Sequence, residues 1–389
     1  MIKVLHIIGS LERGGAENIL ENIASSRTNE IAHVIISLSQ KNRAAVKLKN
    51  SGVKIIEILF REVISSGTLI ERIVSFIKAL IIIVRTVRLE RPDIIHTWMY
   101  HSDLIGGLVA KLFGIPVIWG IFLGNLDEIY YKRSTLIVIK LVSKLSRIIP
   151  TKIISCTRVG AEAHQKIGYP ERKIEFIPIG IDTQNFKYSR ETRLEFRRKI
   201  NCSNEKIVIG MVARWDPQKD YSVFFEAASE VSRIRKDIEF WIAGGYGISK
   251  SNKELSYLEK VSGLENNVRY FGRLEDLVEF YCGLDIFTLT SHGEGTPVVV
   301  GEAMSCRLPC VVSDVGDVSC LLREGAGILL EHNDPKILTD CWLSLISGGR
   351  NLWMEIGEKA RARICDQYDI QRSLDSYIKV YGALYRECA

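Results

Sequence analysis

The stretch DIFTLTSHGEGTPVVVGEAMSCRLPCVVSD, from Asp285 to Asp314, decides the fold class of this chain. Short apolar runs at 285–290 and 309–314 have the length of buried strands, and an apolar helical segment lies between them. A strand, a helix and a second strand in this order form a parallel βαβ unit. Strands that are apolar throughout are buried on both faces, which is typical of a parallel sheet covered by helices.

The start of the helix in this unit is marked by Thr296 and Pro297. Threonine is a common N-cap and proline suits the first helical position, so we expect Thr296 to cap the helix and Pro297 to begin it. Val298, Val299 and Ala303 would then face the sheet. The unpaired N–H groups of the first turn would form a phosphate-sized anion site beyond the preceding strand.

The same alternation of strands and helices extends over the whole chain. Predicted strands lie at 4–8, 33–38, 53–58, 93–98, 116–121, 152–157 and 173–178, and then at 207–212, 238–244, 268–272, 285–290, 309–314 and 326–330. The pattern breaks at 177–186, where proline, glycine and aspartate precede a charged helix. We therefore predict an α/β protein with two Rossmann-like, doubly wound parallel-sheet domains facing each other across a cleft, with bounds of 1–182 and 183–366.

The composition is that of a folded protein of the cytoplasm. Apolar residues make up 47% and charged residues 25% of the 389 residues, and a net charge of +6 does not require a nucleic-acid partner. The nine cysteines form no CxxC pair and no long apolar segment opens the chain, so we expect reduced thiols and a cytoplasmic location. The most apolar stretch, 73–89, contains Lys78 and Arg85 and is predicted to be an amphipathic helix packed on a sheet.

A glycine pair follows the first predicted strand, in GSLERGGAENIL. Gly14 and Gly15 stand just before a helix, where bare backbone N–H groups can approach an anion. The loop is not a GxGxxG motif, and the next strand does not end in an acidic residue, so a dinucleotide site is disfavoured. A plain strand-to-helix turn stays an alternative.

Two cations follow the first strand of the second half, in VARWDPQKDY. Arg214 and Lys219 lie in the loop, and Asp220 is expected to cap the next helix. Fixed cations at the carboxyl end of a strand suit a diphosphate whose charge grows as a bond to it breaks. A pair of solvated charges is the alternative interpretation.

Two glutamates flank the predicted helix start at Thr296. Glu294 precedes the helix, and Glu302 lies in its second turn. Carboxylates are good acceptors for sugar hydroxyls, so one could hold a group beyond the phosphates and the other a group on their near side. The pattern predicts a ligand with a central diphosphate and hydroxyl-rich ends, a nucleotide sugar. A loop acid and an exposed helix glutamate are the alternatives.

With these motifs the sequence resembles the retaining glycosyltransferases of family 4, which have the GT-B fold. The resemblance rests on GGAE, VARWDPQKD, WIAGGYG, VRYFGR and SHGEGTPVVVGEAMSCRLPCVVSDVG, the last with an E-x7-E signature formed by Glu294 and Glu302. It implies a two-domain enzyme that transfers a sugar from a nucleoside diphosphate donor, UDP above all, with retention of configuration. HTWMYHSDLIGG, a narrower likeness, points to the synthesis of bacterial surface polysaccharides such as O-antigen.

The resemblance also implies roles for individual residues. Glu294 would contact the donor sugar and Glu302 the ribose, while Arg214 and Lys219 would hold the diphosphate. The remaining donor contacts would come from Gly15 near the diphosphate, from the backbone of Gly295, Thr296 and Pro297, and from Arg273 and Leu274 near the base. The second domain would hold the donor and the first the acceptor, a saccharide that we expect to be lipid-linked. A final helix within 367–389 would cross back to the first domain.

The chain departs from the family at the tip of the strand predicted at 116–121. Many members have a histidine there that faces the donor sugar, whereas this chain has Phe122. His101 is a candidate to serve the site in its place, with a purely structural histidine as the alternative. No Asp-x-Asp motif occurs, so we predict that no metal and no other cofactor is needed.

Other functions are compatible with parts of this pattern. A nucleotide-sugar epimerase of the same fold would convert the donor without an acceptor. An NAD-dependent oxidoreductase is disfavoured by the absent GxGxxG motif. A nucleotide-sugar binding module without catalysis is the third alternative.

The stretch 130–158 contains seven basic residues and no acidic one. On a helix, four of these residues would form one stripe: Arg133, Lys140, Lys144 and Arg147. One interpretation is a solvated basic edge of a surface helix. The other is a helix that lies on anionic lipid and places the enzyme over its acceptor, peripherally on the inner face of the cytoplasmic membrane.

Overall fold

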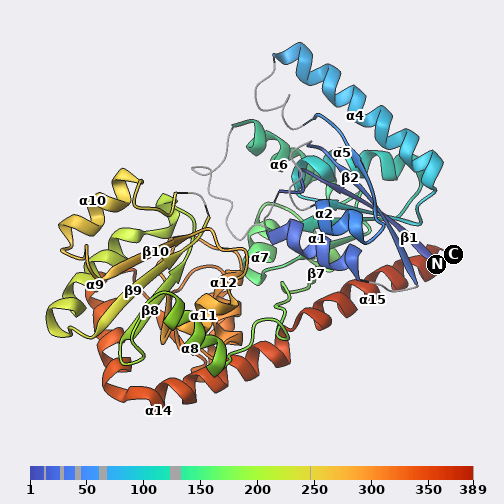
Figure 1. Cartoon of the computed structure of the whole chain (residues 1–389). Coiled ribbons are helices and arrows are strands. Elements are labelled where there is room, and N and C mark those ends of the chain that lie inside the picture. Colours follow the sequence, from blue (N-terminus) through green and yellow to red (C-terminus); the bar gives the residue numbers. More distant parts are fainter. Residues whose placement is uncertain are drawn as a thin grey trace. The chain divides into compact units, whose positions relative to one another are not determined.

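The computed structural model describes residues 1–12, 15–26, 30–39, 45–60, 68–122, 133–245 and 247–388. The chain divides into two compact units (Figure 1). Unit 1 comprises Met1–Gly180 and Gln371–Ala389, and unit 2 comprises Ile181–Ile370. The sequence placed these divisions after residues 182 and 366.

Unit 1 is built on a parallel sheet of seven strands in the order β3-β2-β1-β4-β5-β6-β7. Its strands are β1 (Ile2–Ile8), β2 (Ile31–Ser37), β3 (Lys54–Glu57), β4 (Ile94–Trp98), β5 (Val117–Ile121), β6 (Lys152–Ser155) and β7 (Ile174–Phe176). Its helices are α1 (Gly15–Ser25), α2 (Ala45–Asn50), α4 (Leu69–Glu90), α5 (Tyr100–Phe113), α6 (Arg133–Leu145), α7 (Arg158–Lys166) and the C-terminal α15 (Ile370–Cys388).

One face of this sheet is covered by α4, α5 and α6. The three helices lie next to one another, and their apolar residues share a core with alternate residues of the strands. The chain runs outward from β1 to β3, returns to β4 beside β1 and then continues outward in the other direction. Because the crossovers are right-handed, α4, which connects β3 to β4, lies on the face opposite α1 and α2.

The other face of the sheet carries an aromatic layer under α15. His6 and His96 are neighbours on β1 and β4, and the Nδ1 atom of His96 is 2.8 Å from the hydroxyl of Tyr381 on α15. The Nε2 atom of His6 is 3.0 Å from Nδ1 of His33, and Trp98 donates to Nδ1 of His6. Burial lowers the pKa of both His6 and His96, so both rings are neutral.

Unit 2 contains a parallel sheet of six strands in the order β10-β9-β8-β11-β12-β13. Its strands are β8 (Ile207–Val212), β9 (Ile238–Ala243), β10 (Val268–Gly272), β11 (Ile286–Leu289), β12 (Cys310–Ser313) and β13 (Ile328–Leu330). Its helices are α8 (Arg190–Lys199), α9 (Tyr221–Ile234), α10 (Lys253–Val261), α11 (Val278–Gly283), α12 (Val298–Ser305), α13 (Val318–Leu321) and α14 (Pro335–Gln367), the last broken at Gly349.

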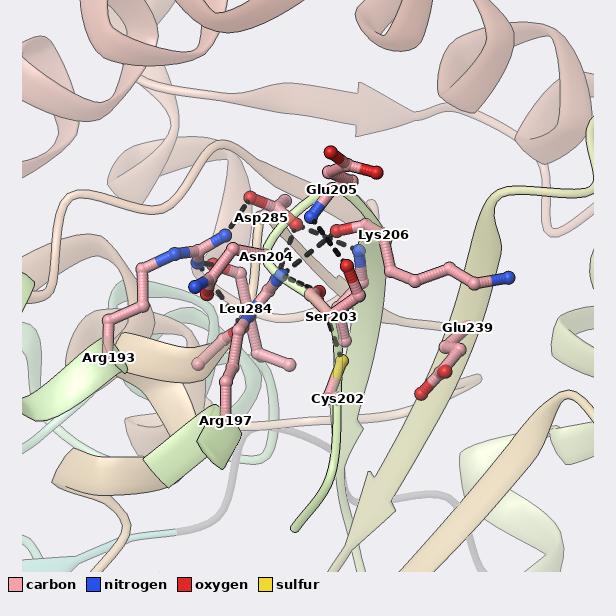
Figure 2. A network of polar contacts seen from close by, with 12 residues as sticks. Arg193, Arg197, Cys202, Ser203, Asn204, Glu205, Lys206, Glu239, Leu284 and Asp285 are labelled. Carbon is pink, nitrogen blue, oxygen red and sulfur yellow. Dashed lines mark hydrogen bonds and ion pairs between the residues drawn. The ribbon is translucent and has the colours of Figure 1, made fainter. Parts of the chain in front are cut away.

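A buried ionic network ties α8 to the amino-terminal edge of this sheet (Figure 2). Asp285, just before β11, binds Arg197 at 2.7 Å and Arg193 at 2.6 Å, and the Arg197 side chain is fully buried. Arg197 also donates to the carbonyl oxygens of Gly283 and Ser203, and the carboxylate of Asp285 accepts the N–H of Val208. The network lies at the edge opposite the strand ends where ligands of such sheets bind, so it serves the fold.

All the strands that the sequence predicts are present, with bounds that differ by a few residues at most. The predicted α/β class with two Rossmann-like parallel sheets is confirmed. Asp220 caps α9 as expected, since its side chain accepts the N–H of Val223.

Candidate active site

The two sheets each have a switch point, where strand order reverses and ligands of open α/β sheets bind at the carboxyl ends. In unit 2 the switch point lies between β8 and β11, which are hydrogen-bonded neighbours. The loop after β8 carries Arg214 and Lys219, and the loop after β11 carries Glu294. The topology therefore brings the predicted cations and the first predicted carboxylate to one place.

An ion pair joins the two loops. The ammonium group of Lys219 contacts the carboxylate of Glu294, and each side chain is 14% exposed. Ser291 donates its hydroxyl to Oε1 of Glu294 at 2.7 Å. The carboxylate is thus held by a cation and a hydroxyl, and a small part of each charged side chain remains exposed.

The backbone of the two loops is fixed by further bonds. The N–H of His292 donates to the carbonyl oxygen of Gln218 at 2.7 Å. The hydroxyl of Thr290 lies 3.0 Å from the carbonyl oxygens of both Lys219 and Asp220. Lys219 therefore sits on a short 3-10 turn, Pro217–Lys219, that is anchored directly to the end of β11.

Sequence reasoning missed a group of polar residues that gathers around Asp220. Asn333, in the loop after β13, donates to Oδ2 of Asp220 and to the carbonyl oxygen of Thr290, both at 2.8 Å. His292 approaches the same Asp220 oxygen at 2.8 Å, and Ser313 at the end of β12 donates to Asn333. Position in the sequence was the available signal, because His292 and Asn333 each follow a predicted strand and Ser313 ends one.

The loop that carries Glu294 also depends on Gly316. A Cβ atom at Gly316 would lie 2.2 Å from the carbonyl oxygen of Gly295 and 2.4 Å from that of Glu294. The φ angle of Gly316 is +58°, and the N–H of Asp317 donates to the carbonyl oxygen of Gly295 at 3.1 Å. Only glycine permits this close approach of the two loops.

Arg214 lies in the same loop as Lys219 but does not contact Glu294. Its side chain is exposed, and its guanidinium binds Asp216 at 2.8 Å. Burial would raise the pKa of Asp216, but the N–H of Gln218 and the Arg214 guanidinium lower it overall. Arg214 is thus positioned at the rim of the site by a carboxylate that is ionised at neutral pH.

The start of α12 differs from the prediction. The helix runs Val298–Ser305 with Pro297 in the N-cap position and no side-chain cap, so Thr296 does not cap it and Pro297 is not its first helical residue. The buried residues include Val300, Ala303 and Met304, whereas Val298 and Val299 are half-buried. Ala303 is thus buried as predicted, and Val298 and Val299 pack against the core of unit 2 while staying partly exposed.

Glu302 is neither an exposed helix glutamate nor in contact with Glu294. Its side chain is half-buried, and the hydroxyl of the fully buried Tyr281 on α11 donates to Oε2 at 2.9 Å. Burial raises the pKa of Glu302 to about 7, although the bond from Tyr281 acts in the opposite direction. A carboxyl group with this pKa is a functional-site candidate, since burial without a charged partner is costly.

The remaining predicted donor residues are spread along the strand ends. Arg273 is exposed and Leu274 is half-buried in the loop after β10, the edge strand of the sheet. In unit 1, Gly15 follows β1 and His101 follows β4, and these two strands flank the switch point of that sheet. Gly14 lies outside the described residues. Phe122 stacks on Trp98 with an interplanar angle of 10°, so it is packed on the aromatic layer.

Only some of the four basic residues predicted to form a stripe on one helix lie on a helix. The helix α6 ends at Leu145, so Arg147 lies in the following turn, and the side chain of Arg133 lies outside the described part of the chain. Lys140 and Lys144 are exposed on α6. Among the helices that the structure describes, none is long and apolar enough to cross a membrane.

A paired cation and carboxylate lie at the strand ends of one of two Rossmann-like sheets, and comparison with known proteins gives the family. The model described as glycosyltransferase family 4 matches residues 13–185, and that described as glycosyl transferases group 1 matches residues 206–348, together most of the chain. The chain belongs to this family and is a glycosyltransferase.

Two relatives are named for acceptors linked to diphosphoundecaprenol. UDP-Gal:alpha-D-GlcNAc-diphosphoundecaprenol alpha-1,3-galactosyltransferase of Escherichia coli is 27% identical over 67% of this chain and 68% of its own length. N,N'-diacetylbacillosaminyl-diphospho-undecaprenol alpha-1,3-N-acetylgalactosaminyltransferase of Campylobacter jejuni is 28% identical over 76% and 78%. HepE of Anabaena in complex with UDP has a TM-score of 0.83 at 18% identity over 98% of this chain and 100% of its own. The structural similarity supports the GT-B class.

Proposed function

We propose that the protein transfers a sugar from a UDP-sugar to a lipid-linked saccharide, with retention of configuration, in the synthesis of a bacterial surface polysaccharide. The observation that carries this proposal is the Lys219–Glu294 ion pair at the switch point of unit 2. The relatives named for undecaprenol-linked acceptors and the UDP complex of HepE support the donor and acceptor classes.

Binding of the donor exchanges the partners of this ion pair. The diphosphate lies against Lys219 and Arg214, and the first N–H groups of α12 add donors for its oxygens. The carboxylate of Glu294, released from Lys219, accepts hydroxyl groups of the sugar. Glu302 accepts the ribose hydroxyls, and Arg273 and Leu274 lie at the base.

Transfer breaks the bond between the anomeric carbon and the diphosphate oxygen, and a bond forms from an acceptor hydroxyl oxygen to the same carbon. The acceptor proton passes to the leaving diphosphate oxygen on the same face of the sugar. Lys219 and Arg214 stabilise the charge that grows on the diphosphate, so no divalent ion is required. Unit 1 holds the acceptor.

The location follows from the acceptor. A lipid-linked saccharide is presented at a membrane, and exposed Lys140 and Lys144 of α6, with Arg147 beyond it, attract anionic lipid. We place the enzyme in the cytoplasm, peripherally on the inner face of the cytoplasmic membrane.

The test is a transfer assay with a panel of UDP-, GDP-, ADP- and dTDP-sugars and an undecaprenyl-diphosphate-linked sugar as acceptor. We expect turnover with a UDP-sugar, a product with the anomeric configuration of the donor by NMR, and undiminished activity in excess EDTA. An inverted product contradicts retention. Loss of activity in EDTA that Mg²⁺ or Mn²⁺ restores contradicts charge stabilisation by Lys219 and Arg214 alone. Conversion of the donor without an acceptor would indicate an epimerase.

A further inference from the structure

The helix α4 has an apolar face that is exposed among the described residues of unit 1. Five of its large apolar residues are exposed to 75, 52, 42, 50 and 45%, and we call them the α4 stripe: Ile70, Ile73, Val74, Ile77 and Ile81. Separations of three, four and seven residues place them on one side of the helix. The opposite side, with Ala79, Ile83 and Val87, is buried on the sheet, so the stripe is not needed for packing.

The stripe is continuous rather than scattered. From Ile70 to Ile81 it spans about 16 Å at the helical rise of about 1.5 Å per residue. Single exposed apolar residues are normal on a protein surface, but a contiguous row of this length marks a surface that contacts something apolar.

The charges around the stripe are basic. Lys78 and Arg85 of α4 are exposed, and the neighbouring helices of the same layer contribute exposed Lys111, Lys140 and Lys144. Exposed apolar residues accompany them: Leu108 and Leu112 on α5, and Ile137 and Leu141 on α6.

The described acidic residues of this layer each bind another residue of unit 1. Glu90 binds Lys54 at 2.6 Å, and Asp103 is buried and accepts the hydroxyl of Thr97 at 2.6 Å. Glu71 forms the capping box with Thr68 at the first turn of α4. The outward side of the layer is therefore apolar and positive, apart from Glu71 at one end.

We propose that the α4 stripe is the surface with which the protein lies on an anionic lipid bilayer. The apolar side chains enter the boundary between headgroups and acyl chains, while the basic side chains beside them stay at headgroup level. A second copy of this chain fits less well, because a symmetric contact through the stripe would bring the same basic residues of both copies together. The inference rests on the proposed work at a membrane and names the element that enters the lipid.

The test is sedimentation of the full chain with vesicles of phosphatidylglycerol and phosphatidylcholine, and with phosphatidylcholine alone. The double variant Ile73→Gln/Ile77→Gln removes the centre of the stripe. The matched control is Ile234→Gln/Val261→Gln, two residues of unit 2 that are each 61% exposed. Thermal unfolding and UDP affinity, which do not depend on lipid, show that the variants are folded and keep the donor site.

We expect the wild type and the control to bind the mixed vesicles and the stripe variant to bind them about tenfold or more weakly, since two isoleucine side chains leave the apolar phase. The inference is overturned if the wild type stays in the supernatant, if the stripe variant binds as well as the control, or if the variant instead abolishes a dimer without changing vesicle binding. Sugar transfer to a soluble acceptor analogue reports the proposed catalysis separately. Transfer without lipid binding overturns only the lipid contact, and lipid binding without transfer overturns only the catalysis.

Discussion

In the Lys219–Glu294 pair, two charged side chains hold each other in place at the end of the sheet. Each of the two charged side chains is 14% exposed. If they were unpaired, they would repel a ligand of the wrong charge or lose their ordered positions. Because they neutralise each other, the protein holds both without a buried free charge. In the proposed donor complex, a nucleotide sugar would offer an anion to Lys219 and hydroxyls to Glu294, so each group would keep a partner.

The first prediction concerns the cation of this pair. Lys219→Ala should reduce turnover by about 10²-fold, because the charge on the leaving diphosphate grows in the transition state. The matched control is Lys359→Ala, whose lysine binds Glu355 at 2.7 Å on the exposed surface of α14. Steady-state kinetics should show control turnover within twofold of wild type. Equal turnover of Lys219→Ala and wild type would show that this lysine does not stabilise the leaving group.

The second prediction uses the raised pKa of Glu302, which burial sets at about 7. Only the ionised carboxylate is a full acceptor for two ribose hydroxyls, so UDP affinity should fall as the pH drops from 8 to 6 and the group takes up a proton. In Glu302→Gln this part of the pH dependence should be absent, and affinity should be lower at pH 8. Calorimetric titrations of UDP at several pH values measure both. An unchanged pH profile in the variant would remove Glu302 from the donor site.

At this scale the sequence predicted where the candidate site residues lie along the chain, but not which residues they contact. Glu294 and Lys219 are recognisable because both follow predicted strands and Glu294 belongs to the E-x7-E signature. Their mutual ion pair depends on β8 and β11 being neighbours, which is a property of the sheet. The roles of Asn333, Tyr281 and Ser291 were missed because each is defined by a partner that is remote in sequence or hidden in the loop.

At the scale of elements, the two edges of the unit 2 sheet have different tasks. The carboxyl edge holds loops whose charges can exchange partners. The amino edge holds the network of Asp285, Arg193 and Arg197, in which the Arg197 guanidinium is satisfied by the carboxylate and by backbone carbonyl oxygens (Figure 2). Through Asp285, just before β11, and the N–H of Val208 on β8, the network joins these two strands at their amino edge.

The third prediction tests this structural network. Asp285→Ala should lower the free energy of unfolding by about 3–5 kcal/mol, because it leaves a buried guanidinium without its counter-ion. Asp237→Ala is the matched control, since Asp237 binds Arg235 at 2.7 Å in an exposed pair, and such pairs contribute about 1 kcal/mol or less. Urea unfolding measures both. Similar losses in the two variants would contradict the structural role of the network.

Elements also show where local sequence signals fail. The Thr296–Pro297 pair is a typical helix start, yet α12 begins at Val298. The N–H of Asp317 binds the carbonyl oxygen of Gly295, and Gly316 lets the two loops pack closely, so tertiary contacts hold the chain extended through Pro297. Local capping preference is weaker than these contacts.

At the scale of the whole molecule, the strands could be predicted because burial on both faces leaves an unbroken apolar run in the sequence. The helix α4 could be predicted from the sequence, but its exposed apolar face could not. Periodicity identifies the face that is buried on the sheet and does not say what contacts the opposite face. The buried histidines and α15 are joined through contacts between residues far apart in the chain, such as His96 with Tyr381, and no sequence motif marks them.

The central claim is that the protein moves a sugar from a nucleotide donor at the Lys219–Glu294 site, and Glu294→Ala tests it most directly. Turnover and UDP affinity should be measured on the same preparations of wild type, Glu294→Ala and the control Glu355→Ala. We predict that Glu294→Ala loses turnover by about 10²-fold or more, because its contacts orient the reacting sugar, while UDP affinity stays within a few-fold of wild type. Near-normal turnover in a folded Glu294→Ala variant that still binds UDP would contradict the account.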